Sequence, residues 1–176
     1  MKQTVLKPEE LVLKNRELFL YENVSETSVL RLIKEIKALD YKNKKPIKLW
    51  INSPGGSTYA GLALINIIRL VKSKIITIIN TEACSMASMI SISGDERYMV
   101  KNGVWMAHDM RGGIWGDYSA KVEYRAEWTK KHYAQLEDIY KKYTKLTNKD
   151  LLIARNGELW LQSEECLQKG IIDKII

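Results

Sequence analysis

The chain has 176 residues, the length of one ordinary globular domain. Hydrophobic residues make up 45% of it and charged residues 28%, a balance that supports a packed core and argues against disorder. Lysines and arginines outnumber acids by 28 to 21, but the lysines gather only at 42–48 and otherwise alternate with acids, so a solvated basic surface is favoured over a nucleic-acid site.

The cysteines and the apolar segments indicate the cellular compartment in which the protein works. Two cysteines, Cys84 and Cys166, are too few for a disulfide framework and suit a reducing environment. The N-terminal residues contain no apolar core of a secretory signal, and no stretch approaches the ~18 apolar residues of a membrane span. We therefore expect a cytoplasmic protein without membrane contact.

The first half of the chain alternates strands with helices. Residues 1–15 have weak periodicity and are expected to form an N-terminal arm. Apolar residues then recur at strand or helix spacing, with breaks at turn residues. The expected elements are a strand from Glu17 to Tyr21, a helix from Ser25 to about Asp40, a strand at Ile47–Asn52, a helix from Thr58 to about Lys72 and a strand at Ile75–Ile79.

The second half continues this alternation and ends in helices. A helix is expected from about Ser85 to Ser93, then two strands paired across the turn Lys101–Gly103, at Tyr98–Val100 and Val104–Ala107. A long mixed-charge helix at 117–144, a short helix capped by Asn148 and another capped by Ser163 complete the chain. This order predicts one α/β domain, a parallel sheet with crossover helices plus a helical extension.

Three expected strands end in residues that could do chemistry, at the edge where open α/β sheets carry their sites. Ser53–Gly56 has adjacent glycines, which allow positive φ and leave N–H groups facing a ligand. Ser85 lies at a strand-to-helix turn, where a hydroxyl is exposed as in a nucleophile elbow, although the G-x-S-x-G pattern is absent. His108 ends a strand that could hold a general base rigidly.

Each feature also has a plain structural explanation. The glycines could form only a turn, Ser85 only a helix cap, and His108 a satisfied histidine at the edge of the core. Cys84 is a rival nucleophile, but its side chain should point away from that of its neighbour. His132, among the charges of the long helix, is expected to be a solvated surface residue.

Together, a serine, a histidine and a free N–H pair at three strand ends form a constellation for acyl transfer. No Cys/His or acidic cluster has metal-ligand spacing, and no phosphate-binding G-x-x-x-x-G-K-[ST] loop is present. We expect no cofactor and no metal, and any energy coupling must come from a partner.

Four segments match one family of serine peptidases in order and spacing. From about Glu17 to Asp173 the chain resembles the proteolytic subunit of the Clp proteases, which has a crotonase-like fold. The resemblance implies a ClpP/crotonase-like α/β fold over residues 1–176, with a handle helix at 117–144, and a serine-type endopeptidase. The matching segments are Ile51–Gly56, Ala83–Ala87, Met106–His108 followed by Gly112–Gly113, and Glu158–Leu161 followed by Glu165 and Gly170–Asp173.

The resemblance also assigns roles by position. It implies that Ser85 is the nucleophile and His108 the general base, and that the N–H groups of Gly56 and Met86 form the oxyanion hole. The third triad position, typically Asp in the family, is Glu158 here, which is one methylene longer.

Two other residues are alternative partners for the imidazole, Asn156 and Asp109. Neighbouring strand residues face opposite ways, which counts against Asp109. The pair Asp109-Met110 replaces a Gln-Pro-like pair of the family and should alter the lip of the substrate channel.

Members of this family assemble into oligomers, and the resemblance implies the same for this chain. It implies a homo-oligomer of seven-membered rings, stacked in pairs through the handle helix, with Trp115 and Trp128 as candidate contacts between subunits. An AAA+ unfoldase would dock on axial loops and apolar surface pockets, although only about 16 residues precede the first strand and the axial-loop segment is shortened.

The leading functional prediction is an endopeptidase that cleaves unfolded polypeptides or short peptides inside an oligomeric chamber, with an ATP-dependent unfoldase. One alternative is a phage-type processing (prohead) protease. Another is a non-catalytic crotonase-like protein that binds acyl thioesters.

Overall fold

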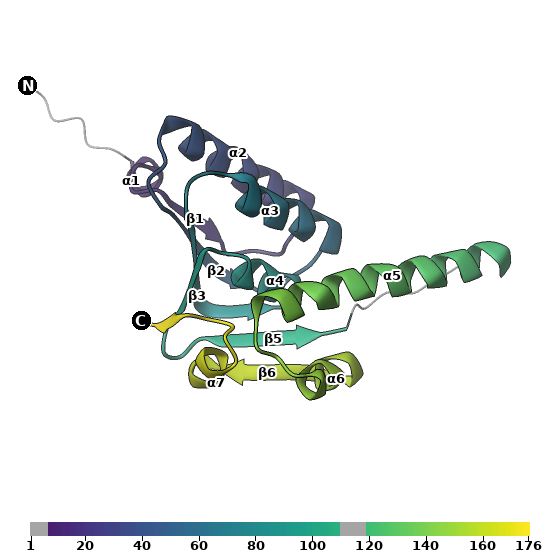
Figure 1. Cartoon of the computed structure of the whole chain (residues 1–176). Helices are drawn as coiled ribbons and strands as arrows, with labels where there is room; N and C mark the ends of the chain where they lie inside the picture. The colour runs from purple at the N-terminus through teal and green to yellow at the C-terminus, as the bar shows by residue number, and fades with distance from the viewer. Residues whose placement is uncertain (1–6, 110–118) are drawn as a thin grey trace, which may run out of the picture.

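A computed structural model describes residues 7–109 and 119–176, which form a sheet with helices packed against it (Figure 1). The strands are β1 (Glu17–Leu20), β2 (Ile47–Ser53), β3 (Ile75–Cys84), β4 (Glu96–Met99), β5 (Val104–His108), β6 (Glu158–Gln162) and β7 (Lys174–Ile175). The helices are α1 (Pro8–Lys14), α2 (Glu26–Lys42), α3 (Thr58–Leu70), α4 (Met86–Ile92), α5 (Ser119–Tyr143), α6 (Asn148–Asn156) and α7 (Ser163–Gln168).

Strands β1 to β4 form the body of the sheet. They neighbour one another in sequence order, every pair is parallel, and β7 joins in parallel beside β4. Parallel neighbours need crossover connections, which are almost always right-handed. Because α2, α3 and α4 connect strands that step in one direction across the sheet, all three cover the same face (Figure 1). The predicted α/β fold, a parallel sheet with crossover helices, is confirmed.

The two faces of the sheet differ in burial. Along β2, Ile47, Leu49 and Ile51 are fully buried, whereas Lys48 is exposed and Trp50 is half-buried. Successive strand residues point to opposite faces, so the first three face the helices and the other two face away. The core therefore lies on the helix side, and the opposite face of β2 retains contact with solvent.

Strand β3 has two neighbours along one edge. Its first half pairs with β4 through Ile76–Ile79, and its end pairs with β5 through Glu82–Cys84. Both neighbours are parallel to β3, so the prediction that they pair with each other across a turn is wrong. The turn at Lys101–Gly103 moves the chain to the next stretch of β3 without reversing it. Strand β6 then pairs with β5 in the antiparallel sense.

The predicted helix starts lie close to the observed ones, but two of the predicted capping residues are wrong. Ser25 caps α2 as expected, with its side chain accepting from a backbone N–H. Thr147, not Asn148, caps α6, and Gln162, not Ser163, is the N-cap of α7. In both cases the capping residue has extended backbone and the next residue is already helical, so the cap lies one position earlier.

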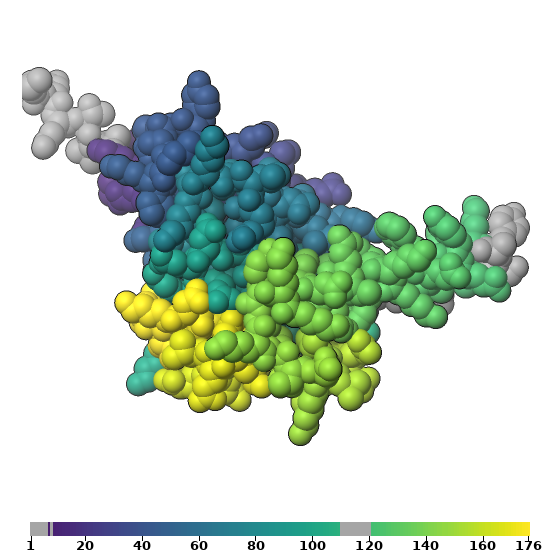
Figure 2. Space-filling model, viewed as in Figure 1, coloured from purple at the N-terminus to yellow at the C-terminus, as the bar shows by residue number. Residues whose placement is uncertain are grey.

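Helix α5 leaves the body of the protein as a long projection (Figures 1 and 2). Its base is buried through Leu136 and Tyr140, whereas Tyr124 and Trp128 on the outer part are 72% and 52% exposed. Trp115 and the predicted start of this helix lie outside the described residues. None of the described helices is long and apolar enough to cross a membrane.

The prediction for His132 is wrong. This residue is only 6% exposed, and its ring stacks on Tyr59 with a centroid separation of 5.0 Å. Its Nε2 also lies 3.4 Å from the hydroxyl of Thr58. The inner face of α5 packs on the start of α3 at this point, so a residue with charged sequence neighbours is buried.

Candidate active site

Ser85 occupies a sharp turn between β3 and α4. Its φ of 54° and ψ of −124° lie in a region that L residues rarely adopt and that costs about 1–3 kcal/mol. The backbone on each side is held: the Ser85 N–H donates to the Met106 carbonyl at 2.8 Å, and the Ser85 carbonyl accepts from the Ser88 N–H at 3.0 Å. The turn is therefore an elbow that presents the side chain at the strand end, which goes beyond an ordinary helix cap.

The glycine pair predicted at the next strand end packs directly against this elbow. Gly55 has a φ of 96°, and a Cβ there would lie 2.6 Å from the Cys84 carbonyl oxygen and 2.7 Å from the Ser85 Cβ. Gly56 has a φ of 147°, and a Cβ there would lie 2.3 Å from the Val24 carbonyl oxygen. Neither position has room for a side chain, so the approach of this loop to the elbow depends on glycine.

The N–H groups assigned to the oxyanion hole are free of backbone strand pairing. Val24 bridges to Gly56 by donating to the Gly55 carbonyl and accepting from the Ser57 N–H, each at 2.8 Å. In such a parallel bridge the N–H of Gly56 itself points away from Val24. The N–H of Met86 belongs to the first turn of α4, where no helical acceptor is available.

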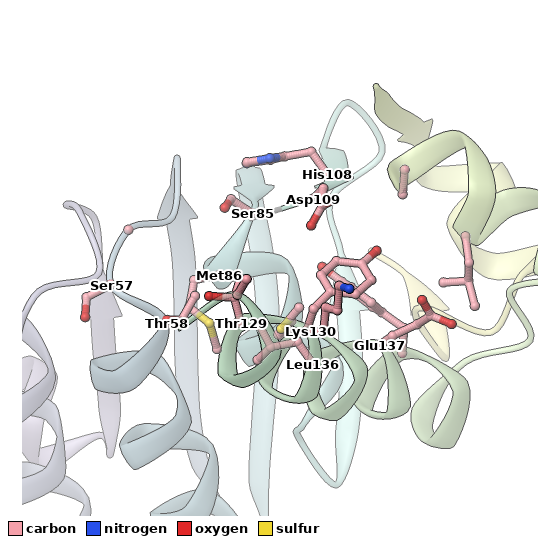
Figure 3. Close-up of a pocket in the computed structure, with 17 residues that line it drawn as sticks. Ser57, Thr58, Ser85, Met86, His108, Asp109, Thr129, Lys130, Leu136 and Glu137 are labelled. Atoms are coloured by element: carbon pink, nitrogen blue, oxygen red, sulfur yellow. The ribbon is translucent and has the colours of Figure 1, made fainter. Parts of the chain in front are cut away.

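His108 is the last residue of β5, and it lies opposite Glu158 in the antiparallel pairing with β6. The imidazole extends toward Ser85, and both residues line one cavity (Figure 3). Among the described residues, no hydrogen bond joins the Ser85 hydroxyl to the His108 ring. Catalytic hydrogen bonds often tighten only when substrate binds, so this separation is compatible with a serine–base pair.

The candidate acids differ in position. Glu158 is exposed, and its Oε2 accepts a hydrogen bond from the Trp160 indole at 2.9 Å. Asp109 follows the end of β5 and also lines the cavity, but its carboxylate points toward α5, whereas the His108 ring extends toward Ser85 (Figure 3). Asn156 is exposed at the end of α6. Glu158 is thus the acid that the sheet aligns with His108.

Cys84 is poorly suited to act as a nucleophile. It is 3% exposed, and its thiol contacts the Glu82 carboxylate at 3.7 Å. Burial, together with the charge of Glu82, raises the pKa of the Cys84 thiol to about 12. A thiol with such a pKa supplies almost no thiolate at neutral pH, which leaves Ser85 as the candidate.

The cavity beside these residues has a volume of about 890 Å³ and is bounded by four helices and two strand ends. Its inner wall is largely apolar, with Met89, Leu136 and Leu151, while Lys130 and Glu137 add charge. Seventeen residues line the cavity, and Figure 3 draws them.

Most of the wall contributed by α5 was missed in the sequence. Ala126, Lys130, Tyr133, Glu137 and Tyr140 all line the cavity. They recur every three or four residues, which is the spacing of one helical face. That periodicity was a usable signal, but the charges on the rest of the helix obscured it.

In the described part of the chain, no group of three or more His, Cys, Asp or Glu side chains is placed to hold a metal ion. What the site offers is a hydroxyl on a strained turn, an imidazole and two backbone donors. Those parts suit acyl transfer through an oxyanion intermediate.

Comparison with known proteins points to one family. The sequence profile of the family described as Clp protease matches residues 2–176. The ATP-dependent Clp protease proteolytic subunit of Deinococcus radiodurans is 32% identical over 168 residues, which cover 94% of this chain and 82% of that protein. Proteins of the same name from Streptococcus mutans and Streptococcus pyogenes are each 32% identical over 169 residues, covering 94% of this chain and 86% of the relative.

Proposed function

The chain belongs to the Clp protease family and is a serine-type endopeptidase, and we propose that Ser85 is its nucleophile and His108 its general base. In this assignment Glu158 is the third member of the triad. The N–H groups of Gly56 and Met86 form the oxyanion hole. The observation that carries the proposal is the strained elbow at Ser85, which shares one cavity with His108 and Gly56.

The reaction follows from these positions. His108 removes the Ser85 proton as Oγ attacks the peptide carbonyl, and the two N–H groups stabilise the negative oxygen of the tetrahedral intermediate. The intermediate collapses to an ester on Ser85, and the leaving amine takes the proton from the imidazolium. Water, deprotonated by His108, then attacks the ester, and the imidazolium returns the proton to Ser85 Oγ as the acid product leaves. Glu158 stabilises the imidazolium that forms in each half of the reaction.

A fluorophosphonate probe tests the nucleophile, because it phosphonylates activated serines. We expect wild-type protein to be labelled and Ser85→Ala not to be. Ser25→Ala is the matched control, since Ser25 caps α2 and is not among the residues that line the cavity, and it should label like the wild type. Equal labelling of Ser85→Ala, or an unlabelled wild type, would refute the assignment.

Assembly and partner form a second part of the proposal. The relatives are named as proteolytic subunits of an ATP-dependent protease. We propose that this chain forms rings of seven, stacked as two, in the cytoplasm, and that an ATP-dependent unfoldase feeds it polypeptide. Tyr124 and Trp128, exposed on α5, are suited to contacts between rings. A monomeric mass in solution would contradict the chamber.

The face of the sheet opposite the helices supplies a candidate docking surface for the unfoldase. Phe19, Trp50, Ile78 and Tyr98 lie side by side across four strands in one row. Phe19, Trp50 and Tyr98 are only half-buried. The Trp50 indole nitrogen has no hydrogen-bond partner among the described residues. We propose that this row, which we call the apolar row, takes an apolar segment of the unfoldase.

Processing of one dedicated substrate and non-catalytic acyl-thioester binding are not favoured by these comparisons, since the relatives are named as proteolytic subunits of an ATP-dependent protease. Stimulation of protein degradation by an ATP-dependent unfoldase is the result expected here. Cleavage that no unfoldase accelerates would argue for the processing protease.

A further inference from the structure

Three buried side chains, those of Ser88, Trp105 and Tyr140, contact one another behind the Ser85 elbow. They take no part in the chemistry described above. We propose that Tyr140, on helix α5, is a positioning residue that aims the Met86 N–H into the oxyanion hole by holding the peptide group between Ser85 and Met86. The inference rests on the proposed roles of Ser85 and Met86, and it adds a residue outside the triad and the oxyanion hole.

Two hydrogen bonds connect Tyr140 to the elbow. The Ser88 hydroxyl donates to the Ser85 carbonyl oxygen at 2.5 Å, and the Tyr140 hydroxyl lies 2.7 Å from the same Ser88 oxygen. A serine hydroxyl carries only one hydrogen, and in Ser88 this hydrogen is already donated to the Ser85 carbonyl. Tyr140 is therefore the donor to Ser88, and the chain of bonds runs from α5 through α4 to the elbow.

The surroundings keep both side chains in place. Tyr140 is 5% exposed and Ser88 is fully buried. The Tyr140 ring meets the Trp105 ring edge to face at a centroid distance of 5.6 Å, and the Trp105 indole donates to the Ser88 carbonyl at 3.3 Å. Burial raises the pKa of the Tyr140 hydroxyl far above its usual value, so the group keeps the proton that it donates.

The carbonyl that receives this chain belongs to the same peptide unit as the oxyanion donor. The Ser85 C=O and the Met86 N–H lie in one rigid plane and point in opposite directions. A bond that fixes the carbonyl therefore fixes the direction of the N–H. The Ser85 backbone is strained, with a φ of 54°, so this plane needs contacts on both sides to stay in place.

Loss of the Tyr140 hydroxyl should weaken catalysis more than substrate binding. Without its donor, the Ser88 hydroxyl is free to turn from the Ser85 carbonyl, and the Met86 N–H is then less well aimed. Removal of a complete oxyanion donor costs about 10²–10³ in turnover. Loss of one supporting hydrogen bond should cost about tenfold in kcat, since the oxyanion exists only in the transition state and intermediate.

Peptide hydrolysis by Tyr140→Phe, Ser88→Ala and the double variant tests the inference. Phenylalanine keeps the ring against Trp105 and removes only the hydroxyl. We expect kcat to fall about tenfold for Tyr140→Phe with KM within about twofold, and the fluorophosphonate to label it about tenfold more slowly. The double variant should be no slower than Ser88→Ala alone, because both changes break one chain.

Tyr143→Phe is the control, because it makes the same chemical change one turn along α5 outside the cavity, and it should keep the wild-type kcat. An unchanged kcat in Tyr140→Phe, a change in KM alone, or effects of the two single changes that multiply in the double variant would each overturn the inference. A wild type that the fluorophosphonate labels at Ser85, together with an equally reactive Tyr140→Phe, refutes this inference alone. An unlabelled wild type refutes the proposed nucleophile instead.

Discussion

His108 and Glu158 lie directly opposite each other in the antiparallel pair of β5 and β6. Residues in such a pair project from the same face of the sheet, with Cβ atoms about 5 Å apart. Trp160, two residues further along β6, projects from that face too, and its indole donates to Glu158 Oε2 at 2.9 Å. The sheet thus pairs the proposed base with a carboxylate that has a neighbouring donor to hold it.

Glu158→Gln tests whether this carboxylate completes the triad. Glutamine keeps the length but cannot balance the charge of the imidazolium, so we expect kcat for peptide hydrolysis to fall by about 10⁴. Glu158→Asp restores the charge and should recover a large part of that loss. Glu164→Gln, an exposed acid at the start of α7, is the matched control and should behave as wild type. A near-normal kcat for Glu158→Gln would reject Glu158 as the third member.

Trp160→Phe tests the support of Glu158. The change keeps an aromatic ring on β6 and removes the N–H that holds the carboxylate. Because Trp160 is 51% exposed, water can replace this donor in part, and we expect kcat to fall only about threefold. Trp50→Phe removes an indole N–H that has no partner among the described residues, and its peptide hydrolysis should not change. Equal rates for wild type and Trp160→Phe would show that the indole does not orient Glu158.

The sequence was sufficient to locate the chemical groups at strand ends. Ser85, His108 and Gly56 each follow or end a strand with a clear apolar pattern, and parallel strands bring their carboxyl ends to one edge. The same reasoning could not show that Ser85 has a positive φ, because serine is also a common helix cap. The position of Gly55 against the elbow explains why a glycine is needed there.

The errors have physical causes as well. β4 and β5 have the short strand–turn–strand pattern of a hairpin, and only the length of β3 allows both to pair with it in parallel. His132 has charged neighbours in the sequence, yet the face of α5 that it occupies packs on α3. In both cases a tertiary contact decides the outcome, and the turn residues or charges next in the sequence do not reveal it.

Gly55→Ala should disable the site by displacing the glycine loop from the elbow. An added Cβ would meet the Cys84 carbonyl at 2.6 Å and the Met86 nitrogen at 2.9 Å, and the φ of 96° is unfavourable for alanine. Backbone strain and overpacking together should lower the free energy of unfolding by about 2–5 kcal/mol. Folded protein should lose at least about 10² in kcat, because the Gly56 N–H moves with the loop.

The control for this change is Gly157→Ala, where the nearest atom to the new Cβ is 3.8 Å away. Urea unfolding and peptide hydrolysis of both variants provide the comparison. A Gly55→Ala protein as active as Gly157→Ala would show that the close approach of the loop is not required.

Trp50→Ala separates docking from catalysis. Trp50 lies in the middle of the apolar row, on the face of the sheet away from the helices and from the cavity. If this row receives the unfoldase, the variant should lose unfoldase-stimulated protein degradation by about tenfold or more and retain hydrolysis of short peptides. Tyr41→Ala, which removes a 92% exposed aromatic outside the row, is the control. Full stimulation of Trp50→Ala would place the docking surface elsewhere.

Asp150 links the stability of the α6 region to pH. Burial opposes its charge, but hydrogen bonds from Lys169 and Thr147 outweigh that effect and hold the pKa of Asp150 at about 2, below its ordinary value of 3.8. A lowered pKa adds stability that is complete above pH 3.8 and is lost as the pH falls toward 2. Allowing for partial solvent screening, we expect about 1–2 kcal/mol at pH 7.

Asp150→Asn removes this charge, so its unfolding free energy should be about 1–2 kcal/mol lower than that of wild type at pH 7. The difference should shrink as the pH falls from about 4 to 2, because wild type loses its own charge there while the variant does not titrate. Other acids titrate equally in both proteins and cancel in the comparison. Urea titrations at pH 7, 4 and 3 measure the difference, with Asp138→Asn, an exposed acid of α5, as the control. A difference that stays constant over this range would mean that packing, and not the ionised carboxylate, is the source of the stability.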